Sequence, residues 1–352
     1  MPGGKIINTV HIRKIVAAAA LGTALLCTAG AAVSTGTGTE VKAAETPEPS
    51  VSAHITGRNG SAAGTGGSTE SAADKHESAV NKLLGPSQPR LNEEERSGIM
   101  NILLIGTDER LDGSDDQGRG DVTMLCSLDK SRGTVKLVSF ERSTAVQWPG
   151  HGDVMLTNAY SYGGAELTMN AVRDCFRVDI AGYVHFDFDS FKDVIDAVGG
   201  VDIELTKAEA DALTEDTYTE IWFSEGMNHL DGDGALRYCR LRRIDDNWQR
   251  VQRQRNTVQA ILTQTKKLSL SRISELAETM LPLIDTDLTG RQLASLLLAA
   301  PKFAGAQAEQ MTIPDRNNIW TYDGTDESVT GCDYRAESER LHEFIYGSEG
   351  SQ

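Results

Sequence analysis

The sequence has 352 residues, enough for two average domains or for one α/β domain with appended segments. Acidic residues outnumber basic residues by 51 to 34, which gives a formal net charge of −17 at pH 7. This balance argues against a nucleic-acid-binding protein, because such proteins neutralise phosphate groups with lysine and arginine. The 5 cysteines form no C-x-x-C pair, which argues against zinc ribbons and disulfide scaffolds.

The N-terminal part of the chain is predicted to be a membrane anchor. Residues 1–14 carry basic but no acidic side chains, and the 19 residues 15–33 that follow carry no charge. A helix of that length spans about 28 Å, close to the ~30 Å hydrocarbon core of a bilayer. The basic flank predicts a cytoplasmic N-terminus and a single-pass protein of the cell membrane, with the chain beyond about residue 35 outside the cell.

Two other interpretations of this segment stay open. Ala29-Gly30-Ala31 would suit a cleaved signal peptide. Cys27 would suit a lipoprotein, although Leu26 before it is bulkier than the small residue typical of such processing sites.

Residues 34–98 are predicted to be a flexible extracellular linker. Their first part is rich in Ser, Thr, Gly and Ala, and such a segment cannot bury enough apolar surface to offset its ordering entropy. A globular domain is expected to follow at 99–346, with a short tail at 347–352.

From residue 99 onward, short apolar runs alternate with helical patterns. The predicted strands are 101–106, 123–128, 135–140, 183–186 and 201–205. The predicted helices are 167–176, 188–198, 248–267, 291–299 and 338–346. Strands that alternate with helices predict a layered α/β domain around one sheet.

Charged residues with a spacing of two stand beside the first two predicted strands. Asp108 and Arg110 follow the first strand, and Arg119 and Asp121 precede the second. Residues two apart share a face of an extended chain, so each pair can present a carboxylate and a guanidinium group to one place.

A second cluster, between residues 237 and 255, holds seven basic and two acidic side chains within the acidic chain. Arginine matches phosphate oxygens with two parallel hydrogen bonds, and paired carboxylates can hold Mg²⁺ together with substrate phosphates. The two clusters therefore predict a metal-bridged phosphate or pyrophosphate site, unless the arginines form a solvated helix face that pairs with surface acids. Arg240 and Arg242 share a face if the chain is extended there, and Arg250, Arg253 and Gln254 share one face of the predicted helix.

A series of short motifs occurs in order along this region. They are NILLIGTD (101–108), RGD (119–121), FER (140–142), NAY (158–160), YGG (162–164), FDF (186–188), VGGV (198–201), LDG (230–232), RYCRLR (237–242) and RVQRQ (250–254). In this order, over residues 99–262, they resemble the LytR-CpsA-Psr family. The resemblance implies a layered αβα domain with a central mixed β-sheet.

The resemblance also implies an enzyme of bacteria with Gram-positive-type walls. Such enzymes transfer a glycopolymer, for example wall teichoic acid or capsule, from an undecaprenyl-pyrophosphate carrier to peptidoglycan, with release of undecaprenyl phosphate. The implied cofactor is Mg²⁺ (or Mn²⁺). The implied partners are a polyprenyl-pyrophosphate-linked glycan, a peptidoglycan acceptor and the cell membrane, with no nucleic acid.

Roles for individual residues follow from the same resemblance. Asp108 and Asp121 resemble the metal-site aspartates of the family. The side chains that resemble its pyrophosphate-binding set are Arg119, Arg142, Arg240, Arg242, Arg250 and Gln254. The expected catalytic residues are Asp121, Arg142 and Arg240, with Asp121 as the first candidate for the base. Arg110 and Arg253 are further candidates from their spacing.

Three positions depart from the family pattern. Glu141 and Ser143 replace the proline and aspartate that usually flank Arg142, and Asn247 stands where the family tends to show aspartate. We expect the negative charge of Glu141 to weaken the hold of Arg142 on phosphate. Two other functions are therefore left open: a non-catalytic, membrane-tethered wall-binding protein, and a hydrolase that passes the pyrophosphate-linked polymer to water.

Overall fold

The computed structural model describes residues 98–347, except 109–117, 216–221, 270–271, 273–274, 277–279, 281–283 and 326. The predicted anchor, its two alternatives, the predicted linker and Arg110 all lie outside the described residues. Within the described part of the chain, no helix combines the length and apolarity that a membrane crossing needs.

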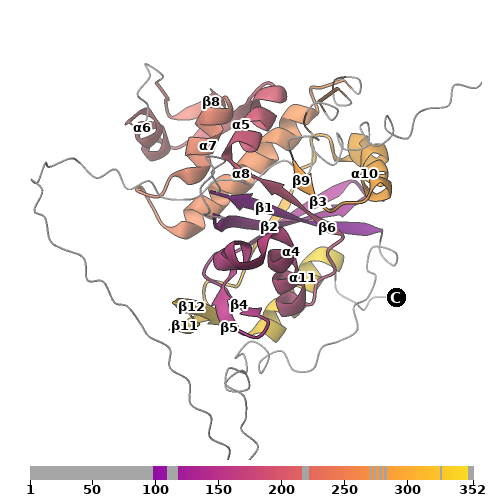
Figure 1. The fold of residues 1–352 in the computed structure, drawn as a ribbon. Helices are drawn as coiled ribbons and strands as arrows, with labels where there is room; N and C mark the ends of the chain where they lie inside the picture. Colours follow the sequence, from indigo (N-terminus) through magenta and orange to yellow (C-terminus); the bar gives the residue numbers. More distant parts are fainter. Residues whose placement is uncertain are drawn as a thin grey trace, which may run out of the picture.

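A six-stranded mixed sheet forms the centre of the domain, in the order β10-β3-β2-β1-β6-β9 (Figure 1). Strand β2 runs antiparallel to β1 and β3, whereas β6 joins β1 and β10 joins β3 in parallel. The predicted α/β fold with a central mixed sheet is therefore confirmed. The strands are β1 (Ile99–Thr107), β2 (Gly120–Asp129), β3 (Thr134–Phe140), β6 (Gly182–Phe186), β9 (Asp285–Thr286) and β10 (Glu309–Ile313).

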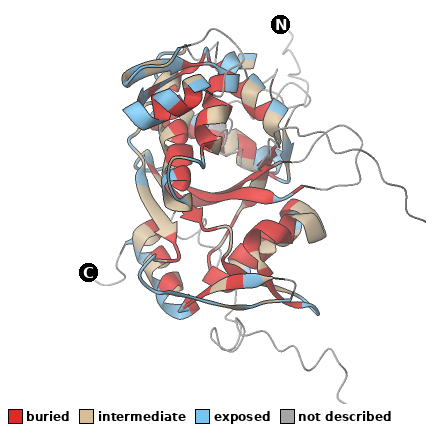
Figure 2. Ribbon diagram, turned by 90° about the vertical axis from the view of Figure 1, so that its left-hand side faces the viewer, coloured by how far each residue is buried: buried red, intermediate tan, exposed pale blue. Residues whose placement is uncertain are grey.

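Each face of the sheet packs against its own layer of helices (Figure 1). One layer contains α5 (Phe188–Ala197), α7 (Gly232–Arg240) and α8 (Asn247–Thr265), and the other contains α4 (Leu156–Phe176) and α11 (Tyr334–Tyr346). Successive side chains of β1 point to opposite layers, so that Leu104 joins the first hydrophobic core and Leu103 the second. Burial on both faces (Figure 2) explains why β1 is a continuous apolar run in the sequence.

Smaller elements complete the two layers. Hairpin β4 (Ala145–Trp148) to β5 (Gly152–Met155) and hairpin β11 (Ile319–Asp323) to β12 (Ser328–Cys332) lie on the side of α4 and α11 (Figure 1). On the other side are α6 (Lys207–Glu215) and the pair β7 (Val201–Leu205) and β8 (Gly226–Leu230). Helix α10 (Gly290–Phe303) lies near the edge of the domain (Figure 1).

Two sequence predictions need correction here. The strand 201–205 forms, but it pairs with β8 in a separate two-stranded sheet, and its alternating buried and exposed residues fit such a one-sided packing. The helix predicted at 167–176 is the second half of α4, which begins at Leu156. Gly163 and Gly164 interrupt α4, and Gly164 has φ 63°, a conformation that favours glycine.

The position of the core predicts which leucines matter for stability. Leu104 is fully buried in the centre of the sheet, whereas the Leu298 side chain on α10 is 83% exposed. We expect Leu104→Ala to lower the free energy of unfolding by about 2–5 kcal/mol, because it leaves a cavity that the core cannot refill. The matched variant Leu298→Ala should change it by less than about 0.5 kcal/mol. Urea unfolding curves test this, and equal losses in both variants would contradict the assignment of the core.

Candidate functional site

A cavity of about 450 Å³ lies at one edge of the central sheet. Strands β1 and β3 end at this edge and the antiparallel β2 begins there, so residues far apart in the sequence converge on it. The start of α8, the turn before it and the β11–β12 hairpin also contribute. The lining residues are Arg119, Glu141, Arg142, Ser143, Met155, Arg242, Asp245, Asp246, Asn247, Arg250 and Glu327.

Four of the predicted arginines line this cavity: Arg119, Arg142, Arg242 and Arg250. The most buried of them is Arg250, which is 1% exposed and whose Nε has no hydrogen-bond partner among the described residues. Burial, with the neighbouring charges of Arg242 and Arg142, lowers the pKa of Arg250 to about 10. Arg250 therefore stays charged at pH 7 in a place where an anion would relieve both the desolvation and the repulsion.

Asp121 lies among these arginines and is almost fully buried. Its Oδ1 is 3.0 Å from Nη2 of Arg142 and accepts a hydrogen bond of 3.2 Å from the Thr157 hydroxyl. Its Oδ2 accepts from Nη2 of Arg242 at 3.3 Å. Burial nevertheless raises the pKa of Asp121 above its usual value, since desolvation outweighs the attraction of the nearby arginines.

Asp108 follows β1 and contributes to the same charge cluster, because its charge also raises the pKa of Asp121. Its carboxylate accepts the backbone N–H of Arg119 at 2.6 Å. Among the residues described by the structure, no group of three or more His, Cys, Asp or Glu side chains could hold a metal ion. If Mg²⁺ binds here, Asp108 and Asp121 would each supply oxygen ligands, and substrate phosphates and water would complete the coordination.

Arg240 and Gln254 do not line the cavity. Helix α7, capped by Asp231, continues to Arg240, so the extended chain that would align Arg240 with Arg242 does not form. The Arg240 guanidinium instead lies 4.4 Å from the ring centroid of Phe188 on α5. Gln254 is buried one turn after Arg250 on α8.

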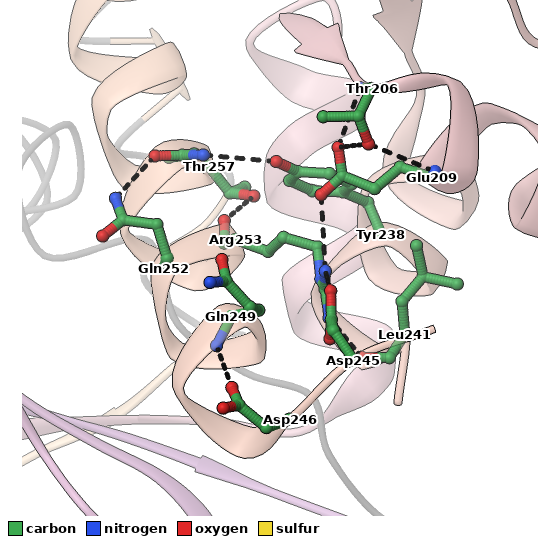
Figure 3. A network of polar contacts seen from close by, with 11 residues as sticks. Thr206, Glu209, Tyr238, Leu241, Asp245, Asp246, Gln249, Gln252, Arg253 and Thr257 are labelled. Carbon is green, nitrogen blue, oxygen red and sulfur yellow. Dashed lines mark hydrogen bonds and ion pairs between the residues drawn. The ribbon is translucent and has the colours of Figure 1, made fainter. Parts of the chain in front are cut away.

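The expectation that Arg253 faces phosphate is also wrong. Its guanidinium forms ion pairs with Asp245 at 2.6 Å and with Glu209 at 3.3 Å (Figure 3). Both carboxylates come from outside α8, and helical spacing alone could not reveal them. A buried arginine with two such partners is neutralised by the protein itself.

The three positions that depart from the family pattern contact one another. The Glu141 carboxylate accepts hydrogen bonds from the Ser143 backbone N–H at 2.6 Å, from the Ser143 hydroxyl and from the Asn247 side-chain amide. These donors are neutral, and Arg142 forms its ion pair with Asp121 instead. Neutral donors leave the Glu141 charge in place, and this charge also acts on Arg250, so the expected weakening of Arg142 stays a prediction.

Sequence reasoning gave no site role to Asp245 and Asp246 of the lining, and it missed Glu327, which lies just before β12. Its carboxylate accepts a hydrogen bond from the side-chain amide of Asn158. Asn158 belongs to the NAY motif, but no motif includes Glu327, so the contact between them could not be predicted from the sequence.

The raised pKa of Asp121 predicts a pH-dependent effect of Asp121→Asn on stability. The folded state binds the Asp121 proton more tightly than the unfolded state does. The free energy of unfolding of the wild type therefore falls as the pH rises through the raised pKa, because the buried carboxyl group then ionises. Asparagine does not ionise, so the free energy of unfolding of the variant relative to the wild type should be higher at pH 7 than at pH 4. Urea unfolding at both pH values measures this difference. An identical difference at both would contradict the raised pKa.

Known proteins resemble this chain in sequence and in fold. Residues 61–338 match the model of the LytR_cpsA_psr family. The polyisoprenyl-teichoic acid–peptidoglycan teichoic acid transferase TagT of Bacillus subtilis (strain 168) is 31% identical over 183 residues, 51% of this chain and 57% of that protein. The matched region thus spans less than two thirds of this relative.

Two solved structures share the fold. "TagT bound to LIIa-WTA" matches with a TM-score of 0.60 and 24% identity over 75% of this chain and 98% of that chain. "LytR-CPS2A-psr family protein YwtF (TagT) with bound octaprenyl pyrophosphate lipid" matches with a TM-score of 0.54 and 21% identity over 78% of this chain and 97% of that chain. Since the family model covers more than half of the chain, the protein belongs to the LytR-CpsA-Psr family.

Proposed function

We propose that the protein transfers a glycopolymer from an undecaprenyl-pyrophosphate carrier to peptidoglycan and forms a phosphodiester link. The observation that carries this proposal is the cavity lined by Arg119, Arg142, Arg242 and Arg250, with Asp121 buried beside it. Several converging guanidinium groups suit a ligand with two adjacent phosphates. The transferase name of the relative and the octaprenyl pyrophosphate in the YwtF structure support the same ligand class.

The proposed reaction is a phosphoryl transfer. The 6-hydroxyl of a muramic acid attacks the sugar-linked phosphorus, a new P–O bond forms, the bond to the bridging oxygen breaks, and undecaprenyl phosphate leaves. Arg142, Arg242 and Arg250 line the cavity, and in this proposal they stabilise negative charge on the phosphoryl oxygens and on the leaving group. Asp121 is our candidate for the group that accepts the hydroxyl proton, since a raised pKa makes a carboxylate a stronger base.

Asp108 and Asp121 are the residues that would hold Mg²⁺ (or Mn²⁺). When bound, such an ion would neutralise charge on the phosphate oxygens. Arg240 and Gln254 remain in the proposed ligand set on the family resemblance alone.

One observation bears on the first of the two alternatives. A non-catalytic wall-binding protein was suggested by the residues that flank Arg142, but the Glu141 carboxylate is occupied by Ser143 and Asn247. Hydrolysis would need the same arginine cavity, with water as the acceptor. The proposal of transfer over hydrolysis therefore rests on the family.

One incubation separates the three functions. Full-length protein is mixed with a lipid-linked glycan, Mg²⁺ and peptidoglycan oligomers, and the products are identified by mass spectrometry. Polymer joined to the oligomer supports transfer, and free polymer alone supports hydrolysis. Without release of undecaprenyl phosphate, both enzymatic proposals fail.

We expect Arg250→Ala to slow the release of undecaprenyl phosphate by about 10²–10³-fold, because it removes a buried donor aimed at phosphate. Arg335 on α11 is exposed and lies outside the cavity lining. Arg335→Ala is therefore the matched control and should release undecaprenyl phosphate at the wild-type rate. Equal rates in both variants would remove Arg250 from the proposed mechanism.

We also propose that residues 15–33 anchor the protein in the cell membrane, with residues 1–14 cytoplasmic and the globular domain outside. The supporting feature is the uncharged run after the basic end. A blot of membrane and soluble fractions with an antibody against a tag at the N-terminus should detect the intact chain in the membrane. Loss of the tag from the mature protein would indicate a cleaved signal peptide instead.

A further inference from the structure

Arg253 is a buried arginine that the proposed reaction does not use (Figure 3). Its side chain is 2% exposed. Nη1 and Nη2 each donate to one carboxylate oxygen of Asp245 at 2.6 Å, so this contact is bidentate. Nη2 also donates to the carbonyl oxygen of Leu241 at 2.7 Å. One side chain therefore binds both the first and the fifth residue of the turn 241–246.

This turn connects α7 to α8 and carries residues of the cavity. Arg242 reaches Asp121 from it, with Nη2 at 3.3 Å from Oδ2. Asp246, at its end, accepts the backbone N–H of Gln249 at 3.1 Å and so caps the helix that carries Arg250. An irregular turn of this kind loses conformational entropy when it is held in one shape.

The guanidinium group of Arg253 is itself held from a third element. Nη1 donates to Oε1 of Glu209 on α6 at 3.3 Å. The other oxygen of Glu209 accepts from the backbone N–H and the hydroxyl of Thr206, each at 2.9 Å (Figure 3). The network therefore ties the turn to α6, whose buried apolar residues belong to the first hydrophobic core.

We propose that Arg253 is a positioning residue. It fixes the turn 241–246 so that Arg242 and Arg250 face the same cavity before an anionic ligand binds. A site ordered in advance binds more tightly, because the cost of ordering is met during folding. Lysine could not do the same, since a single ammonium group lacks the planar fork that contacts Asp245 and Leu241 together.

The nature of the ligand rests on the proposed function, whereas the order of the turn does not. The experiment therefore measures both, on the full-length chain. Hydrogen exchange followed by mass spectrometry reports the protection of backbone amides in residues 241–246. Calorimetry with inorganic pyrophosphate as the probe reports binding. The test variant is Arg253→Lys.

The matched control is Arg255→Lys, two residues further along α8. Arg255 is also buried, and it donates to Gln310 at 3.1 Å and to Thr312 at 2.8 Å, both on β10. We expect both variants to unfold at a lower temperature than the wild type. Only Arg253→Lys should exchange faster in the turn and bind pyrophosphate about tenfold more weakly.

Normal exchange of the turn in Arg253→Lys would overturn the proposal, whatever happens to binding. Equally fast exchange in Arg255→Lys would also overturn it, since the effect would then be general loosening. If the turn loosens in Arg253→Lys alone but the wild type binds no pyrophosphate, the positioning role is supported and the anion site of the proposed function fails.

Discussion

The candidate site is organised around a buried carboxylate between two arginines. One carboxylate oxygen of Asp121 pairs with Arg142 and the other pairs with Arg242. Asp121 lies at the start of β2, Arg142 just after β3 and Arg242 in the turn before α8. Ion pairs do not fully offset the burial of a carboxylate, as the raised pKa of Asp121 shows. An arrangement that costs stability without contributing to the core is typical of a functional site.

The central sheet brings these groups together because of its strand directions. Since β2 runs antiparallel to β1 and β3, Asp108 after β1, Asp121 in β2 and Arg142 after β3 all lie at one edge. The period of two along each strand could be predicted from the sequence, and it paired Arg119 with Asp121. That Asp108 and Asp121 belong to one site was predicted from the family resemblance. Strands β1, β2 and β3 could also be predicted, because burial on both faces of the sheet requires apolar runs that the sequence shows.

What the sequence could not show depends on partners distant along the chain. Strand β7 was predicted as a strand, and its alternating pattern fits one-sided packing, but the sequence does not show that β8 pairs with it in a separate sheet. Arg240 has the spacing for a shared face with Arg242, but the cap at Asp231 starts a helix that carries it to Phe188. Glu327 reaches the cavity on a hairpin that carries no motif. For β7 and Glu327 the deciding contact is tertiary, and the local pattern does not identify the partner. For Arg240 the local cap at Asp231 decides the helix, and only the contact with Phe188 is tertiary.

Arg250 and Arg253 show how much such contacts decide. They are the same residue type, three positions apart on α8, and both are almost completely buried. Burial lowers the pKa of Arg250 to about 10, while for Arg253 the hydrogen bonds and charges of Asp245 and Glu209 outweigh burial and raise the pKa. A buried guanidinium group that the protein neutralises stabilises the fold, whereas one that faces a cavity without such neutralisation has its charge available to a ligand. Neither the net charge nor the helical spacing distinguishes Arg250 from Arg253. Their surroundings assign Arg253 to the support of the turn and Arg250 to the proposed pyrophosphate site.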